Sequence, residues 1–291
     1  MRAGEQSAAK PGAAGYVAML VPVAALAVFF LVPFGIMIAV SFYERIPDGF
    51  YEPGFELTHY RRFLSDLFLR VLVFSVGVSA VSAAICVIVG VPLAYAIATL
   101  RRPMQTAWLV FIVAILSLSE VIIGFSWSML LSRTAGISNL FVSAGILDAP
   151  VAYSPGLLAL LSGMVFLALP YSVLVLYPAV SRLDPMAAEA ARTLGATPAR
   201  AFLTVTVPSL RGAILATAIM VFVFTLGVYL LPQLLGQPSH WTLSVLITDQ
   251  AIFQSNLPFA AALAVFLMLV SLTLIAVTLM IGQVRRREAV S

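Results

Sequence analysis

Six long apolar stretches divide the chain, and polar or basic residues separate them. Each stretch reaches the roughly 20 residues that a helix needs to cross the hydrocarbon core of a membrane. The stretches cover residues 16–42, 68–100, 104–131, 155–180, 212–236 and 258–284. Charged residues, proline or glycine bound each of them. The pattern therefore predicts an all-α integral membrane protein with six transmembrane helices.

The amino-acid composition agrees with this interpretation. Of the 291 residues, 62% are hydrophobic and only 10% are charged, and the mean hydropathy is +1.08. A soluble domain of this size cannot bury so much apolar surface, so lipid must be the solvent. We expect one transmembrane domain over residues 16–284, with short cytoplasmic tails at 1–15 and 285–291. The first stretch is too long for a secretory signal and no small-residue cleavage site follows it, so we expect a retained anchor.

Lysine and arginine are distributed unevenly between the loops. Most lie in the first tail, at Arg101 and Arg102, in the loop of residues 181–211, and at 285–287. The other side has fewer basic residues, and acidic residues such as Glu44 and Asp66 offset them. Basic loops face the cytoplasm, so we expect both termini and the 181–211 loop to be cytoplasmic. The net charge of +4 reflects this orientation, and we expect no nucleic-acid partner.

The loop between the fourth and fifth stretches contains a polar segment with strong helix signals. Asp184 is a good N-cap residue, Pro185 fits the first helical position, and Gly195 is a typical helix stop. A second start follows at once, with Thr197 as cap and Pro198 in the first turn, and this helix should run to about Thr206. We call residues 184–208 the elbow: two short helices joined at a glycine, able to occupy a groove in a partner protein.

The elbow sequence has a characteristic spacing. Glu189, Ala190 and Ala191 are followed by three residues, Gly195, nine residues and the segment Val205-Thr206-Val207-Pro208. This spacing resembles the Glu-Ala-Ala signature of permease subunits in ATP-driven bacterial importers, whose last element reads Ile-x-Leu-Pro; here two valines replace the isoleucine and the leucine. The resemblance implies that Glu189, Ala190, Ala191, Gly195 and Pro208 dock the transporter's ATPase.

Other segments extend the resemblance over nearly the whole chain. They include Val32-Pro33-Phe34, the outer-loop segment of residues 59–64, Gly90-Val91-Pro92 with the three residues after it, and residues 230–236. With the elbow, they resemble the permeases of spermidine and putrescine importers, which share a six-helix core. Relatives that import ferric iron, opines, thiosulfate or phosphonates share these outer motifs, so the family is more sharply indicated than the cargo.

The resemblance also implies the partners of this chain. They are a dimer of ATPase subunits, a second permease, which is either a different protein or a second copy, a periplasmic or lipid-anchored solute-binding protein, and membrane lipid. The implied location is the bacterial inner membrane. The outer segment from His59 to Arg62 suits electrostatic docking of an external protein, although it equally fits an interfacial amphipathic helix.

Glu120 is the only acidic residue deep inside a predicted transmembrane helix. A charged side chain at the centre of such a helix costs about 2.5 to 3.5 kcal/mol, so Glu120 should face a polar interior. Two interpretations stay open. It lines the translocation path and attracts a cationic solute, or it is a packing or gating carboxylate bonded to nearby serines or to a partner permease. Trp127 and Tyr171 could line the same path through cation–π contacts, but aromatic residues in membrane helices more often pack or anchor at the interface.

The sequence lacks the residue patterns of an enzyme. Cys86 is the single cysteine, and His59 and His240 suggest no metal site. Neither a phosphate-binding loop nor a dinucleotide glycine fingerprint occurs. We therefore expect no catalytic residue and no cofactor, with ATP bound by a separate subunit. The alternative of a stand-alone secondary transporter or channel predicts an inverted repeat and leaves the elbow unexplained. A membrane enzyme would need more than the lone Glu120.

Overall fold

The computed structural model describes residues 13–46, 51–134 and 136–288 of the chain. Within these residues, every regular element is a helix, apart from one isolated bridge that pairs Glu44 with Glu52. The elements are, in order, α1 (Ala13–Val40), α2 (Thr58–Arg61), η1 (Arg62–Leu64), α3 (Asp66–Thr99), α4 (Arg102–Leu116), α5 (Glu120–Leu130), α6 (Ile137–Ser143), α7 (Leu157–Ser181), α8 (Pro185–Thr193), α9 (Pro198–Ala201), η2 (Phe202–Thr206), α10 (Val207–Ser209), α11 (Arg211–Gly227), α12 (Leu230–Leu235), η3 (Pro238–His240), α13 (Leu243–Thr248), η4 (Asp249–Phe253) and α14 (Leu257–Glu288).

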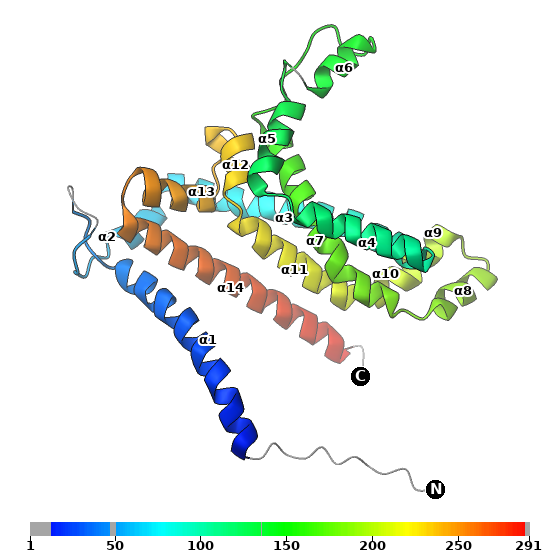
Figure 1. The fold of residues 1–291 in the computed structure, drawn as a ribbon, viewed down its shortest axis with the longest axis horizontal. Coiled ribbons are helices and arrows are strands. Elements are labelled where there is room, and N and C mark those ends of the chain that lie inside the picture. The colour runs from blue at the N-terminus through cyan, green and yellow to red at the C-terminus, as the bar shows by residue number, and fades with distance from the viewer. Residues whose placement is uncertain (1–12, 47–50, 135, 289–291) are drawn as a thin grey trace.

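Three long helices, α3, α7 and α11, form the centre of the molecule and contact one another. In Figure 1, α14 and α1 lie along one side of this centre, while α5 and α6 extend away from it. The elbow helices α8 to α10 lie together at the end of the molecule where α3 and α7 end and α4 begins. The elbow therefore belongs to one end of the helix bundle.

The central helices approach closely because small residues face each other. Gly90 of α3 lies against Ser172 of α7, and a Cβ atom at Gly90 would come 2.5 Å from the Ser172 hydroxyl oxygen. That hydroxyl donates a hydrogen bond of 3.1 Å to the Cys86 carbonyl, in addition to one within its own helix. Cys86 itself is fully buried among Ala83, Ala168 and Val221. It is a packing residue at the centre of the bundle.

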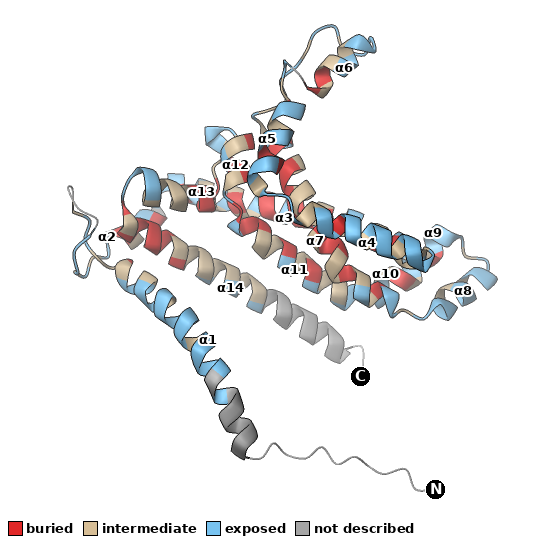
Figure 2. Cartoon of the chain, viewed as in Figure 1, coloured by how far each residue is buried: buried red, intermediate tan, exposed pale blue. Residues whose placement is uncertain are grey.

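Burial divides the helices into two groups. In Figure 2 the buried residues concentrate in α3, α7, α12 and the start of α14, with fewer in α11, whereas α1 and α8 are exposed along most of their described length. For α1 the exposed side chains are apolar, including Leu26, Phe29 and Leu31, as expected of a helix that lies against lipid. For α8 the exposed surface is mixed, and it lies at the end of the bundle.

The six predicted transmembrane segments correspond to the upper count that the structure allows, and two of them need correction in form. Four helices are individually long and apolar enough to cross a membrane among the described residues, and the count reaches six when each of two bent pairs is taken as one segment. The predicted third helix, residues 104–131, is really α4 and α5, which meet at 91°. The predicted fifth, residues 212–236, is interrupted between α11 and α12 at Val228 and Tyr229.

These breaks have a local cause that average hydropathy does not detect. Ser119 has extended backbone angles, and Glu120 starts a new helix directly after it. At the other break, Val228 is extended and α12 begins two residues later, with Pro232 in its first turn. Proline is tolerated there because the first N–H groups of a helix have no intrahelical acceptor.

Several predictions concern residues outside the described part of the chain. Residues 1–12 of the first tail, the outer-loop residues 47–50 and the last three residues belong to this group. The described helices nevertheless start and end near the expected points, since α1 begins at Ala13 and α14 ends at Glu288. In the view of Figure 1, α1 begins and α14 ends on the side towards the elbow.

Candidate functional site

The first helix of the elbow is built as the sequence predicts. The Asp184 carboxylate accepts a hydrogen bond of 2.9 Å from the Met186 N–H, and Pro185 occupies the first helical position. At the other end the Gly195 N–H donates to the Arg192 carbonyl, and the Ala196 N–H donates to the Ala191 carbonyl, each at 3.0 Å. This paired closure needs a left-handed residue, and Gly195 has φ of +89°. The glycine therefore sets the direction of the turn between the two elbow helices.

The second elbow helix differs from the prediction at its end. Thr197 caps it through the Arg200 N–H, as expected, but the helix continues beyond Thr206 to Ser209. Over Phe202–Thr206 it widens to a π-helix, in which the Val207 N–H reaches back to the Phe202 carbonyl. The 74° bend towards the next membrane helix comes at Leu210, after Pro208. Pro208 lies just after the π-helix, where the regular α-helical ladder is already interrupted, so its missing N–H is tolerated.

Leu210 anchors the elbow in the bundle. It is buried against a cluster that includes Val91 and Ile97 of α3 and Leu176 of α7. The sequence analysis did not single it out, because one leucine beside an apolar stretch carries no distinguishing signal. The elbow is thus joined to the bundle through a buried residue at its end, while α8 buries none of its own side chains.

The residues predicted to dock an ATPase lie on the accessible part of the elbow. Glu189, Ala190, Gly195 and Pro208 are exposed, and Ala191 is half-buried. Within the part of the chain that the structure describes, the single ion pair joins His59 and Glu56, so Glu189 is not paired with Arg192. Its carboxylate is free to meet a partner.

Large apolar side chains on the elbow are exposed as well. Leu194 is 89% exposed, Met186 70% and Leu203 63%. Apolar side chains grouped on a segment outside the membrane helices indicate a protein contact. Between the elbow and the ends of α3 and α7 lies a groove of about 420 Å³, lined in part by Tyr95, Ser181 and Thr206. The elbow therefore rests on the bundle without filling the space behind it.

Glu120 lies where the two interrupted segments meet. It is the first residue of α5, not the middle of a straight helix, and its side chain is half-buried. Its Oε1 atom accepts hydrogen bonds from the N–H groups of Leu230, at 3.2 Å, and Leu231, at 3.1 Å. These are the first two residues of α12. We call this arrangement of α5, α12 and the Glu120 carboxylate the bend junction.

Packing around the bend junction is close. Gly124 of α5 and Gly163 of α7 face α12, and Cβ atoms at these positions would come 2.8 Å from Leu234 and 2.5 Å from Leu235. Leu231 and Leu235 are fully buried in a cluster with residues of α3, α5 and α7. The two glycines thus let the α12 leucines fit between α5 and α7.

The other two predicted path residues lie in aromatic contacts. Trp127, also on α5, packs edge to face against Phe166 with ring centroids 5.9 Å apart. Tyr171 of α7 stacks on Phe224 of α11 at 5.4 Å. Glu120 and Trp127 therefore share α5, while Tyr171 faces a different helix.

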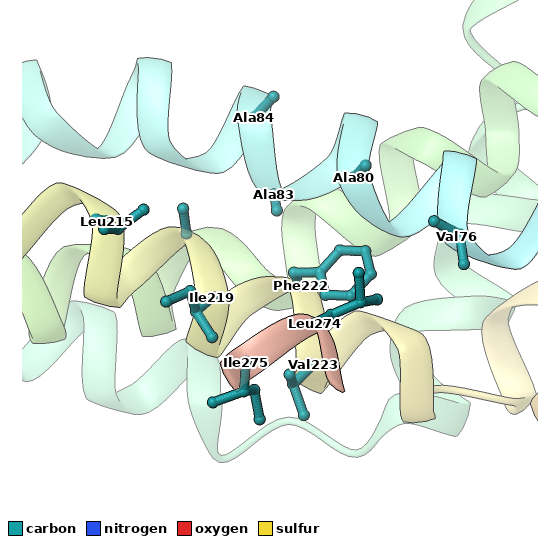
Figure 3. Close-up of a pocket in the computed structure, with 11 residues that line it drawn as sticks. Val76, Ala80, Ala83, Ala84, Leu215, Ile219, Phe222, Val223, Leu274 and Ile275 are labelled. Carbon is teal, nitrogen blue, oxygen red and sulfur yellow. The ribbon is translucent and has the colours of Figure 1, made fainter. Parts of the chain in front are cut away.

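The apolar groove shown in Figure 3 is a poor candidate for a polar cargo. It has a volume of about 380 Å³ and lies between α3, α11 and α14. Its walls are formed by side chains such as Ala80, Ala83, Phe222 and Leu274, without a charged residue among those that line it. A charged solute would lose its hydration there without gaining partners.

In the outer segment from His59 to Arg62, for which docking and an interfacial helix both stay open, His59 is buried whereas Arg61 and Arg62 are exposed. The His59 side chain is 4% exposed, and its Nε2 atom lies 3.2 Å from the Tyr43 carbonyl and 3.7 Å from the Glu56 carboxylate. Arg62 stacks over the Phe259 ring at 5.2 Å. Across the described residues, no cluster of three His, Cys, Asp or Glu side chains could hold a metal ion.

Sequence signals for the bend junction exist but are short. Serine followed by glutamate at Ser119-Glu120 is a helix-start pattern, and Pro232 marks a first turn two residues after Leu230. Both lie inside apolar stretches of transmembrane length. Hydropathy averaged over 20 residues does not detect such local helix starts.

Comparison with protein families gives one assignment for most of the chain. Residues 57–287 match the sequence model of the family described as "Binding-protein-dependent transport system inner membrane component". The chain is 28% identical over 249 residues to the spermidine/putrescine transport system permease protein PotB of Haemophilus influenzae, covering 86% of this chain and 87% of that protein. It is 26% identical over 247 residues to PotB of Escherichia coli strain K12, covering 84% and 89%.

More distant matches agree on the fold. The sulfate transport system permease protein CysW of Synechocystis is 27% identical over 254 residues, covering 84% of this chain and 87% of that protein. A crystal structure of a bacterial ABC transporter involved in the import of the acidic polysaccharide alginate matches with a TM-score of 0.74 at 20% identity, covering 94% of this chain and 95% of that one. A second, in complex with an alginate pentasaccharide-bound periplasmic protein, matches with 0.73 at 20% identity, covering 90% and 92%.

Proposed function

Because the chain belongs to the family of binding-protein-dependent transport system inner membrane components, and is a multi-pass permease of an ABC importer and not an enzyme, we propose that its elbow receives the ATPase. The observation that carries this proposal is the exposed elbow, with an unpaired Glu189, the small residues Ala190 and Ala191, and a left-handed turn at Gly195. Small side chains let a partner backbone approach closely, and exposed apolar side chains supply contact area.

The anchoring of the elbow supports a coupling role. A force on α8 reaches α11 through η2, α10 and the bend at Leu210, since these elements are consecutive in the chain and Leu210 is buried in the bundle. Closure of two ATPase subunits would move the elbow and, through it, the helix bundle, so that access alternates between the two sides of the membrane. ATP is bound by the partner, and this chain supplies no cofactor site.

The full transporter contains three further components. They are a dimer of ATPases, a second permease that completes the path, and a solute-binding protein that delivers cargo to the outer face. The chain resides in the bacterial inner membrane, with both termini on the cytoplasmic side. The basic residues near the elbow, among them Arg101, Arg182 and Arg211, support this orientation.

For the cargo, we infer a polyamine or a related small cation. The similarity to two spermidine/putrescine permeases supports this class, and so does Glu120, whose Oε2 atom has no hydrogen-bond partner among the described residues. A half-buried carboxylate with one open oxygen attracts a cation through a low-dielectric path. Trp127 and Tyr171 contribute aromatic faces, which also favour cations. The family includes a sulfate permease, so an anionic cargo is the alternative.

Reconstituted uptake tests the proposal. The chain, its companion permease, the ATPase and the binding protein are assembled in proteoliposomes and given spermidine, putrescine or sulfate. We expect the vesicles to take up the polyamines only when ATP is supplied on the side of the membrane where the ATPase lies. Sulfate uptake without polyamine uptake would refute the cargo, and uptake that is independent of ATP would refute the coupling.

Reporter fusions test the orientation separately. Fusions after Arg102 and near Gly195 should report cytoplasm, whereas fusions near Asp148 and Gln254 should report periplasm. The elbow can meet an ATPase only on the cytoplasmic side. A periplasmic signal from the Gly195 fusion would overturn the coupling proposal.

A further inference from the structure

The first N–H groups of α12 need a partner inside the protein. The break at Val228 and Tyr229 ends the hydrogen-bond ladder of α11, so the N–H groups of Leu230 and Leu231 have no intrahelical acceptor. Leu231 is fully buried. A buried backbone N–H group without a partner is costly, and more so at membrane depth, where water cannot replace it. The Glu120 carboxylate satisfies both groups with one oxygen atom.

The other end of α12 is held as well. The Leu235 carbonyl accepts a hydrogen bond of 2.8 Å from the Gly156 N–H, just before α7. Two residues beyond the helix end, the Gln237 side-chain amide donates to the Pro155 carbonyl at 3.2 Å. Both ends of α12 are therefore bonded to chain segments outside its own span, α5 at the start and the beginning of α7 at the end.

We propose that Glu120 is a positioning residue, which holds α12 between α5 and α7 by accepting the Leu230 and Leu231 N–H groups. The leucines of α12 fill the space opposite Gly124 and Gly163 only while the helix keeps this place. Movement of α12 away from α5 must break both hydrogen bonds and leave two N–H groups unpaired. Glu120 consequently favours the conformation seen here over any in which α12 has moved.

The charge of Glu120 and its hydrogen bonds have separate roles. Attraction of a cation needs the negative charge and rests on the proposed function, whereas positioning of α12 needs only an acceptor oxygen at the same distance. Glu120→Gln removes the charge and keeps a carbonyl oxygen in place. Glu120→Asp keeps the charge but withdraws the oxygens by one methylene group, and Glu120→Ala removes both. Comparing the three substitutions therefore distinguishes the role of the charge from the role of the hydrogen bonds.

Hydrogen exchange of the purified full chain in lipid nanodiscs tests the positioning role without partners or cargo. We expect the peptide covering residues 226–236 to exchange at least about tenfold faster in Glu120→Ala and Glu120→Asp, because two charge-assisted hydrogen bonds are lost. Glu120→Gln should remain within about threefold of the unmodified chain. Ser119→Ala is the matched control, because Ser119 is exposed and its side chain makes no capping bond to α5.

Several results would overturn the proposal. The first is an unchanged exchange rate of this peptide in both Glu120→Ala and Glu120→Asp. The second is an exchange rate in Glu120→Gln that is as fast as the rate in Glu120→Ala. Faster exchange spread evenly over α3 and α7 would indicate general destabilisation and also contradict it. If Glu120→Ala does not fold, the exchange rates of Glu120→Asp and Glu120→Gln can still be compared, and this comparison tests the positioning role. Failure of polyamine uptake leaves these measurements unaffected, so the positioning role and the cargo are judged independently.

Discussion

The elbow and the bend junction are both built on short helices, but they are stabilised in different ways. The elbow helix α8 buries no side chain, and its ends are closed by its own neighbours, Asp184 at the start and Gly195 at the end. Helix α12 is bonded at its start to a residue 110 positions earlier in the chain, and its leucines are buried between two other helices. The elbow presents its surface to a partner, whereas α12 is held by the rest of its own chain.

This difference predicts where substitutions act. A change on the exposed surface of α8 should alter association and leave the fold intact, because α8 buries none of its side chains. A change at the bend junction should alter the position of α12 or the stability of the bundle, because Leu231, Pro232 and Leu235 of that helix are buried. The following predictions test the contrast, beginning with the largest effect.

A charged side chain at the small elbow residues Ala191 or Gly195 should abolish the coupling between the permease and the ATPase. Ala191→Glu and Gly195→Asp are expected to lower ATPase binding by more than about a hundredfold, since an unpaired carboxylate at a close protein contact costs several kcal/mol. ATPase co-purification and ATP-dependent uptake are the measurements, and the amount of permease in the membrane should not change.

The chain offers a matched control for this experiment. Gly145, after α6, is also left-handed, with φ of +73°, and nothing lies within 4 Å of a Cβ atom there. Gly145→Asp therefore introduces the same backbone strain and the same charge at a site remote from the elbow. Equal loss of coupling in Gly145→Asp and Gly195→Asp would mean that strain, not docking, causes the effect.

Removing the charge of Glu120 should have a smaller and more selective effect. Glu120→Gln is expected to lower uptake of a cationic cargo about tenfold, corresponding to roughly 1.4 kcal/mol of lost attraction, with expression and ATPase assembly preserved. Uptake is measured in the reconstituted transporter. Undiminished uptake by Glu120→Gln would defeat the path role while leaving the positioning role intact.

Close packing at α12 should give an effect of similar size, but on stability and not on uptake. Gly163→Ala places a Cβ atom 2.5 Å from Leu235, and overpacking of this kind costs about 1–3 kcal/mol. Thermal unfolding of the purified chain should shift down by a few degrees.

Gly77→Ala is the control for this substitution. Gly77 lies in α3, and a Cβ atom there would meet nothing within 4 Å. Alanine is the better helix former, so this variant should be unchanged or slightly more stable. A similar downward shift in both variants would show that α12 is not tightly packed against α7.

Much of the architecture could be predicted because its signals are local or extend along continuous segments. The caps at Asp184 and Thr197 and the stop at Gly195 depend on neighbouring residues, and the structure contains all three. Four of the six apolar segments are single helices there, and the other two are interrupted. The end of the second elbow helix was less predictable. We expected it to end at about Thr206, but the helix continues to Ser209 and bends where Leu210 is buried in the bundle.

The sequence alone determined that this chain is a helical membrane protein with a helix–glycine–helix elbow, because hydropathy and capping are properties of short segments. It also identified Glu120 as a residue that must find a polar partner. Only the tertiary structure decided which partner that is. A carboxylate in an apolar environment requires a donor, but the donors are backbone N–H groups of Leu230 and Leu231, freed by a break in another segment. Such a contact depends on how distant helices pack, which no local pattern encodes.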